Sequence, residues 1–121
     1  MRFLESHKVN GCNDELTIEV LDEPGSGGAN HRYMVSFPNL NCNNHFLIAF
    51  QNGPIKEVGT NGLTHESLIA ILIDRLEAFQ SGPYKSGYNG NALHHLRKAQ
   101  EELFNKTRER LVRNVEGTHT V

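Results

Sequence analysis

The sequence predicts an α+β fold, with a small antiparallel β-sheet in the N-terminal half followed by an antiparallel hairpin of two helices. Two observations carry this prediction. Short β-rich runs separated by turn residues extend to about residue 60, and from residue 64 the apolar residues recur at helical spacing. We expect residues 1–121 to form a single domain, with a β-rich part over residues 1–60 and the helical hairpin over residues 64–115.

Three runs rich in β-branched, aromatic and other apolar residues predict the strands. They are Leu16 to Leu21, Tyr33 to Phe37 and His45 to Phe50. The segments between them, EPGSGGAN and PNLNCNN, have turn chemistry, because glycine supplies positive φ and asparagine bonds its own backbone. The connections are short, so we expect neighbouring strands to pair antiparallel.

The helical part begins at Thr64, which is suited to cap a helix, and the first helix is expected to stop at Gly82 and Pro83. We expect Asn91 to cap a second helix. The apolar surface of the two helices is wide, so we expect other copies of the chain to complete the core. The residues at helical spacing are Leu68, Ile69, Leu72, Ile73, Leu76 and Phe79 in the first helix, and Leu93, Leu96, Leu103, Phe104, Leu111 and Val115 in the second.

The glycine-rich segment between sheet and helices, FQNGPIKEVGTNG, lacks the spacing of a phosphate-binding loop. A P-loop needs G-x-x-x-x-G-K-[ST], whereas here Lys56 lies between Gly53 and Gly59. The local pattern favours a turn at Asn52 to Pro54, a short extended segment IKEV and a second turn before the helix.

Composition and charge exclude several classes of function. The formal net charge is −2, with six Lys/Arg against ten Asp/Glu over residues 1–90 and six against four over residues 91–121. An anionic ligand would favour the C-terminal segment, but the excess is too small for a general nucleic-acid binder. The longest apolar run, Leu68 to Ile73, is too short for a membrane span. The first ten residues lack the apolar core of a signal peptide, so we expect the protein in the cytoplasm.

No catalytic or metal-binding constellation is visible, and we expect neither a cofactor nor a metal. Cys12 and Cys42 form no C-x-x-C pair, which favours buried or free thiols. His94 and His95 are adjacent on the expected helix and so point about 100° apart, which suits a shared metal poorly.

Several side chains suit a nucleotide-like anion. Phe79 can stack on a base, and Asn91 can bond a base edge or a ribose. Arg108, Arg110 and Arg113, near the end of the second helix, can bind phosphate. The simple structural alternatives are a core residue, a helix cap and a solvated charge, respectively. Asn91 and Arg108 lie seventeen residues, or about 25 Å, apart on one helix, so a shared small ligand would need a second subunit.

The run IAFQNGPIKEVGTNGLTHESLIAILIDRLEAFQSGP, continued by NALHHLRKAQEELFNKTRERLVRNVEGTH, resembles the phage family of Thoeris anti-defence proteins that sequester cyclic ADP-ribose signals. That family shares its helical hairpin with anti-CBASS sponges for cyclic oligonucleotides. The resemblance covers about residues 47–119. The FQNGP, EVGxNG, IDRL, AFQxGP and TRxRxxRxVEGT elements are modest alone but jointly specific.

The resemblance implies a non-enzymatic protein in the host cytoplasm that holds glycocyclic ADP-ribose between two chains. It implies a homodimer that can assemble into a hexamer, a trimer of dimers, with separate sites for cyclic di- and trinucleotides. Phe79 in AFQ matches the base-stacking aromatic, Asn91 the polar contact and Arg108 in TRxR the phosphate partner. Arg113 and Thr118 of the VEGT turn are weaker candidates for the same pocket.

The sequence departs from the family before the second helix. Family members often read GPF-x-C-R-E-N-A, whereas this chain reads GPYKSGYNGNA, which is two residues longer and lacks that arginine. The middle of the second helix, RKAQEELF, is also more polar than in the family. The choice among isomers and subunit packing therefore stay open. The alternatives are an enzyme that degrades cyclic nucleotides, a small helical nucleic-acid-binding regulator and a plain assembly module.

Overall fold

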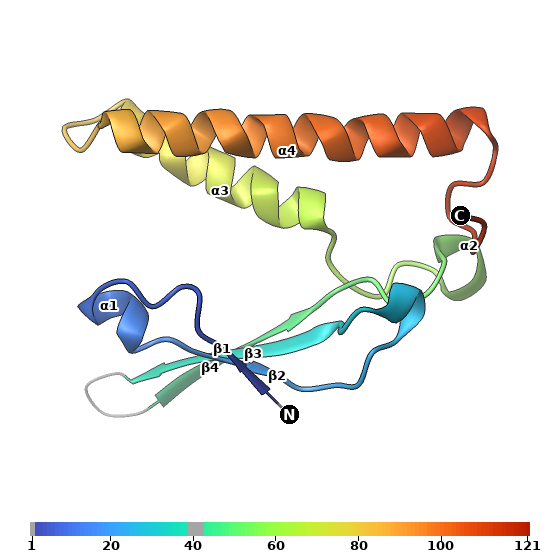
Figure 1. Cartoon of the computed structure of the whole chain (residues 1–121), viewed down its shortest axis with the longest axis horizontal. Helices are drawn as coiled ribbons and strands as arrows, with labels where there is room; N and C mark the ends of the chain where they lie inside the picture. The colour runs from blue at the N-terminus through green and yellow to red at the C-terminus, as the bar shows by residue number, and fades with distance from the viewer. Residues whose placement is uncertain (1, 39–42) are drawn as a thin grey trace. The chain divides into compact units, whose positions relative to one another are not determined.

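The computed structural model describes residues 2–38 and 43–121. Internal contacts group the chain into two compact units. The first comprises Met1–Gly53 and Val58–Leu63, and the second comprises Pro54–Glu57 and Thr64–Val121. The first unit contains the sheet and the second contains the two long helices (Figure 1). The expectation of a single domain stays a prediction.

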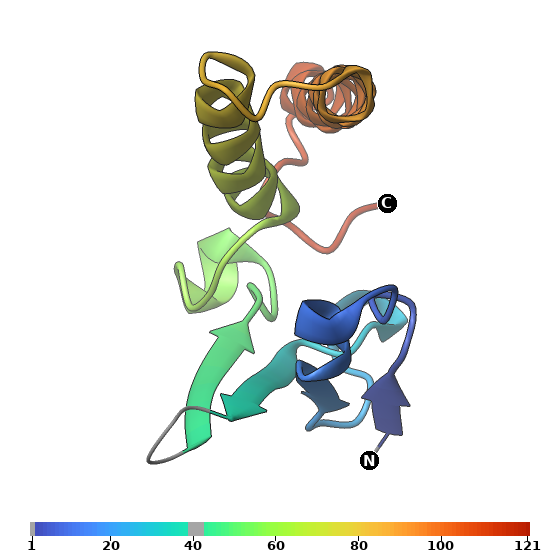
Figure 2. The ribbon, with the colours of Figure 1, turned by 90° about the vertical axis from the view of Figure 1, so that its left-hand side faces the viewer.

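The first unit is built on a four-stranded antiparallel sheet with the strand order β1-β2-β3-β4 (Figure 2). This sheet and the helices that follow confirm the predicted fold class. Three strands match the predicted runs, while the first strand has only three residues and went unpredicted. The bounds are β1 Arg2–Leu4, β2 Thr17–Val20, β3 Arg32–Pro38 and β4 Asn43–Ala49.

The strand register creates the core of this unit. Val20, Tyr33 and Ile48 pair in one row across β2, β3 and β4, so their side chains share a face of the sheet. Val20 is only 2% exposed. Tyr33 meets Phe50 edge to face, with ring centroids 5.8 Å apart.

The connection between β2 and β3 is held by a carboxylate. Asp22 accepts from the backbone N–H groups of His31 at 3.0 Å and of Arg32 at 3.1 Å. Burial raises the pKa of Asp22, but these hydrogen bonds to the charged form outweigh that effect and hold the pKa below its ordinary value. The short 3-10 helix η1 (Ser26–Gly28) forms the tip of the connection, and Gly27 there has φ 74°, as the turn prediction requires.

A one-turn helix, α1 (Gly11–Asp14), precedes β2. The side chain of Asn10 caps it by accepting from the Asn13 backbone N–H at 2.9 Å. Cys12 lies on this helix as an exposed free thiol. Cys42 lies outside the described residues.

The chain after β4 returns alongside the end of the sheet. Phe50 and Leu63 form a parallel bridge, in which Gln51 N–H donates to the Leu63 carbonyl and Leu63 N–H donates to the Ala49 carbonyl, each at 2.8 Å. A Cβ at residue 62 would lie 2.4 Å from the carbonyl carbon of Phe50. Gly62 is therefore required for this close approach of two backbone segments.

The predicted extended conformation of IKEV is wrong, because Ile55–Val58 forms a one-turn helix, α2. Pro54 begins the turn, and its carbonyl accepts from the Glu57 N–H at 3.0 Å. The Lys56 N–H donates to the Gly117 carbonyl at 3.0 Å. This partner is far away in the sequence, so no local pattern could indicate it.

The second unit is the predicted hairpin, formed by α3 (His65–Gln80) and α4 (Gly87–Val112), which lie side by side in opposite directions (Figure 1). Thr64 caps α3 as predicted, accepting from the Ser67 N–H at 3.1 Å. Shielded residues along the middle of the two helices are spaced alternately three and four apart, which is the pattern of a coiled-coil seam. They are Ile69, Ile73, Leu76 and Gln80 on α3, and Leu93, Leu96, Gln100, Leu103 and Thr107 on α4.

Further apolar residues of the hairpin lie outside this seam. Ile71 is 62% exposed on α3, and Leu111 is 60% exposed on α4. Leu72, Phe79, Phe104 and Val112 are exposed as well. The seam accounts for only part of the apolar surface. Assembly of several copies stays a prediction that this surface supports.

The approach of Gly62 to Phe50 generates a stability prediction. We expect Gly62→Ala to lower the free energy of unfolding by about 1–3 kcal/mol, because the added methyl group overlaps backbone atoms that cannot move away cheaply. Urea denaturation followed by circular dichroism measures this change. The matched control is Gly87→Ala, where a Cβ meets no atom within 4 Å. Equal midpoints for the two variants would contradict the assignment.

Candidate functional site

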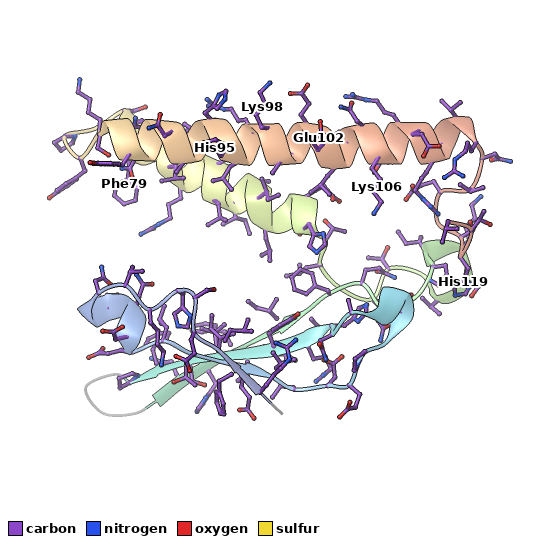
Figure 3. The ribbon with its side chains drawn as sticks, in the orientation of Figure 1. Phe79, His95, Lys98, Glu102, Lys106 and His119 are labelled. Atoms are coloured by element: carbon purple, nitrogen blue, oxygen red, sulfur yellow. The ribbon has the colours of Figure 1, made fainter. Side chains whose placement is uncertain are left out.

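Two of the predicted site residues lie near the end of the hairpin where the helices are joined. Phe79 is in the last turn of α3 and is 36% exposed (Figure 3). Asn91 is exposed in the second turn of α4. The connection between the helices is fixed by Gln80, whose side chain accepts from the Ser86 N–H at 2.9 Å and donates to the Ser86 carbonyl at 3.0 Å.

The prediction that Asn91 caps the second helix is wrong. The helix begins one turn earlier, and Ser86 is its cap, accepting from the Asn89 N–H at 3.0 Å. The bonds from Gln80 place Ser86 at this position, which outweighs the low helix propensity of Gly87 and Gly90. The side chain of Asn91 has no hydrogen-bond partner among residues 2–38 and 43–121, so its donors and acceptor are available to a ligand.

Arg108 lies toward the opposite end of the same helix. The helix is unbroken over 26 residues, so the seventeen residues from Asn91 to Arg108 span about 25 Å. The structure therefore separates these two candidates within one chain. A small ligand cannot contact both unless a second chain supplies one of them.

The arginines near the end of α4 differ in what they already bind. Arg110 donates to the carbonyls of Val115 at 2.9 Å, Thr118 at 3.2 Å and Thr120 at 2.7 Å, and its Nε contacts Glu116 at 3.2 Å. This arginine is fully engaged in holding the C-terminal turn.

Arg113 is engaged as well, while Arg108 is not. Arg113 pairs with Glu109 and donates to the Val121 carbonyl at 2.9 Å. Arg108 makes one exposed hydrogen bond, to the side chain of Asn105 at 2.8 Å, and pairs with no acid among the described residues. It is the arginine of this end that is most available for an anion.

Thr118 is part of the C-terminal turn. Its hydroxyl donates to the Val115 carbonyl, and Gly117 has φ 80°, which lets the chain reverse. The Thr118 carbonyl is one of the acceptors of Arg110. The hydroxyl proton is used within the turn, and the oxygen also accepts from the Thr120 N–H at 3.3 Å, so one lone pair is left for a ligand donor.

An unpredicted arginine lies beside Phe79. The guanidinium carbon of Arg75 is 5.0 Å from the centroid of the Phe79 ring, a cation–π contact worth about 0.5–1 kcal/mol at an exposed position. A hollow of about 520 Å³ is lined here by Ile71, Asp74, Arg75, Ala78 and Phe79. The spacing of Arg75 and Phe79, four residues apart on a helix, was a sequence signal for this contact.

The polar groups of the glycine-rich loop form hydrogen bonds with one another. Asn61 N–H donates to the Gln51 side chain and Asn52 N–H donates to the Asn61 side chain, both at 2.8 Å. The Gln51 amide donates to the carbonyls of Gly53 at 3.1 Å and Gly59 at 2.8 Å. These N–H groups already have acceptors within the loop and are not available to a phosphate. The geometry agrees with the sequence prediction that the loop is no phosphate cradle.

Other kinds of site receive no support from the residues that the structure describes. Over residues 2–38 and 43–121, no three His, Cys, Asp or Glu side chains gather as metal ligands would. Within the same residues, no helix combines the length and the apolar character needed to cross a membrane.

Comparison with known proteins identifies the hairpin. Residues 43–103 match the model of the family described as Acb2/Tad1, hairpin domain. The chain belongs to the Acb2/Tad1 hairpin-domain family. It is also 43% identical over 72 residues to Thoeris anti-defense 1 of Bacillus phage SBSphiJ7, a match that covers 60% of this chain and 51% of the relative. The chain thus spans about half the length of the curated relative it matches.

The family match and the candidate residues overlap in part. The Acb2/Tad1 hairpin match includes Phe79 and Asn91 but ends before Arg108. The assignment of Arg108 therefore depends on its own geometry and on the TRxR element. Arg113 and Thr118 lie beyond the matched residues too.

The difference between Arg110 and Arg108 can be measured. We expect Arg110→Ala to lower the free energy of unfolding by about 1–3 kcal/mol, because three carbonyls and Glu116 lose their partner. Arg108→Ala, the matched control, should change it by less than about 0.5 kcal/mol. Chemical denaturation of both variants checks this. A larger loss for Arg108→Ala would reverse the roles assigned to the two arginines.

Proposed function

We propose that this protein is a phage anti-defence sponge that binds and sequesters glycocyclic ADP-ribose, the immune signal of Thoeris, without cleaving it. Membership of the Acb2/Tad1 hairpin family and the similarity to Thoeris anti-defense 1 support this proposal. The protein acts in the host cytoplasm and needs no cofactor. It works by lowering the concentration of free signal, so the defence effector is not activated.

The observation that carries the proposal is a set of exposed groups on the hairpin that make few or no contacts of their own. Phe79 offers an exposed ring, Asn91 an unpartnered amide, and Arg108 a guanidinium without an acidic partner among the described residues. These groups match the base, the ribose or base edge, and the diphosphate of the signal, respectively.

The site forms between two chains. Asn91 and Arg108 are about 25 Å apart on one rigid helix, so an antiparallel pair of hairpins brings Phe79 and Asn91 of one chain to Arg108 of its partner. A two-fold axis repeats this arrangement and gives two equivalent sites per dimer. The exposed apolar residues of the hairpin, among them Ile71 and Leu111, supply surface for self-association.

The required affinity is compatible with such a site. Capture at nanomolar concentration needs about 12 kcal/mol. A stacked base contributes about 1–3 kcal/mol, and a hydrogen bond to a charged group contributes about 1.5–3 kcal/mol. These contributions do not add simply, because ordering of ligand and side chains opposes them. Enclosure of the ligand between two chains supplies the remainder.

A second layer of the proposal concerns assembly. Dimers associate into a hexamer, a trimer of dimers, that carries separate sites for the cyclic di- and trinucleotides of CBASS defence. The support for this layer is the family itself, whose hairpin domain is described jointly for Acb2 and Tad1. The preferred ligand is then decided by titration against both classes of signal.

The proposal predicts capture followed by release of unchanged ligand. Protein incubated with glycocyclic ADP-ribose and freed of unbound ligand by gel filtration should return the intact cyclic compound on heating. Mass spectrometry of the released compound identifies it. A linear product would show a hydrolase instead. The absence of any retained nucleotide would leave a plain assembly module.

The site residues are tested by substitution. We expect Phe79→Ala and Asn91→Ala to weaken capture by at least tenfold each, since each removes about 1.4 kcal/mol or more of direct contact. Calorimetry measures the affinity, and gel filtration should show an unchanged oligomer. Phe3→Ala is the control, since Phe3 is an exposed aromatic residue of the sheet unit. Retained capture by both site variants would refute the assignment.

A further inference from the structure

We propose that Arg75 is a further ligand-binding residue, which binds a phosphate of the nucleotide whose base stacks on Phe79. This inference rests on the proposed function and adds a cation to the site. Arg75 belongs to neither the predicted set of site residues nor the basic end of α4. Its contact with Phe79 is seen in the structure.

The first observation is its position. Arg75 lies one helical turn before Phe79, so both side chains are on the same face of α3. Its guanidinium carbon is 5.0 Å from the Phe79 ring centroid. Both residues line the same open surface hollow on this helix. A base stacked on Phe79 therefore brings its attached sugar and phosphate within reach of Arg75.

The second observation is that Arg75 forms no ion pair within the described residues. Arg97, on the facing helix, is paired with Glu77 at 2.8 Å, and Arg110 and Arg113 are held by the C-terminal segment. In the part of the chain that the structure describes, Arg75 has no hydrogen bond to another side chain and no acidic partner. Its contact with the Phe79 ring is a weak interaction that a phosphate can replace with stronger charge-assisted hydrogen bonds.

The third observation is the neighbouring carboxylate. Asp74 lines the same hollow and adjoins Arg75 in the sequence. An ionised carboxylate only accepts hydrogen bonds, so it suits ribose hydroxyls or an exocyclic amine and repels phosphate. The two opposite charges orient a ligand in the hollow, so that its phosphate lies at Arg75 and its hydrogen-bond donors lie at Asp74. A ligand that joins a base, a ribose and phosphate in a compact ring fits this order of groups.

The test compares charge-removing and charge-keeping substitutions. Binding of glycocyclic ADP-ribose to the full chain is measured by calorimetry at low and high salt for wild type, Arg75→Gln, Arg75→Lys and Arg97→Gln. We expect Arg75→Gln to bind about tenfold more weakly and to lose part of the salt dependence, because one charge-assisted contact is gone. Arg75→Lys should keep the salt dependence with intermediate affinity, since it keeps the charge without the planar fork. Arg97→Gln should match wild type.

Each outcome shows whether Arg75 contacts the phosphate of the ligand. Wild-type affinity for Arg75→Gln would overturn the role of Arg75 while the proposed function stands. Weaker binding with an unchanged salt dependence would also overturn it, because Arg75 would then only support the Phe79 ring. A wild-type protein that binds no glycocyclic ADP-ribose would remove the proposed function and the role of Arg75 together. Circular dichroism and gel filtration verify that the variants keep fold and assembly.

Discussion

The rigidity of one long helix determines how this protein can hold a small ligand. α4 runs unbroken from Gly87 to Val112, so Asn91 and Arg108 stay about 25 Å apart. No rotation of side chains closes that distance. If both groups contact one compact ligand, the site exists only in the assembled protein. The exposed apolar residues of the hairpin then contribute to binding, because they hold the two chains together.

The arginines of the hairpin also divide into those that hold the fold and those that are available to a ligand. Arg110 donates hydrogen bonds to the carbonyls of the C-terminal turn, and Arg113 pairs with Glu109. In contrast, Arg108 and Arg75 lack acidic partners among the described residues. Four cations that look alike in the sequence therefore have different roles. Arg110 and Arg113 hold the C-terminal segment through its carbonyls, whereas Arg108 and Arg75 are suited to bind phosphate.

Local signals predicted much of this fold. Short runs rich in β-branched, aromatic and other apolar residues, separated by turn residues, indicated three of the four strands, and Thr64 marked the start of α3. The sequence could not show features whose partners are distant or tertiary. The helix at Ile55–Val58 depends on Gly117, and the start of α4 depends on the bracing of Ser86 by Gln80. The candidate residues Phe79, Asn91 and Arg108 came from the sequence and the family resemblance, whereas the commitment of Arg110 required the folded C-terminal turn.

The central claim, that one ligand is held by two chains, is tested most directly by mixing two weakened variants. Asn91→Ala and Arg108→Ala should each bind glycocyclic ADP-ribose at least tenfold more weakly than wild type. In a mixed dimer, one site combines the intact Asn91 of one chain with the intact Arg108 of the other. Co-refolding the two variants in equal amounts should therefore restore about a quarter of the wild-type sites at wild-type affinity, as counted by calorimetry. Mixed dimers that form, as verified by two affinity tags, but recover no binding would contradict the account.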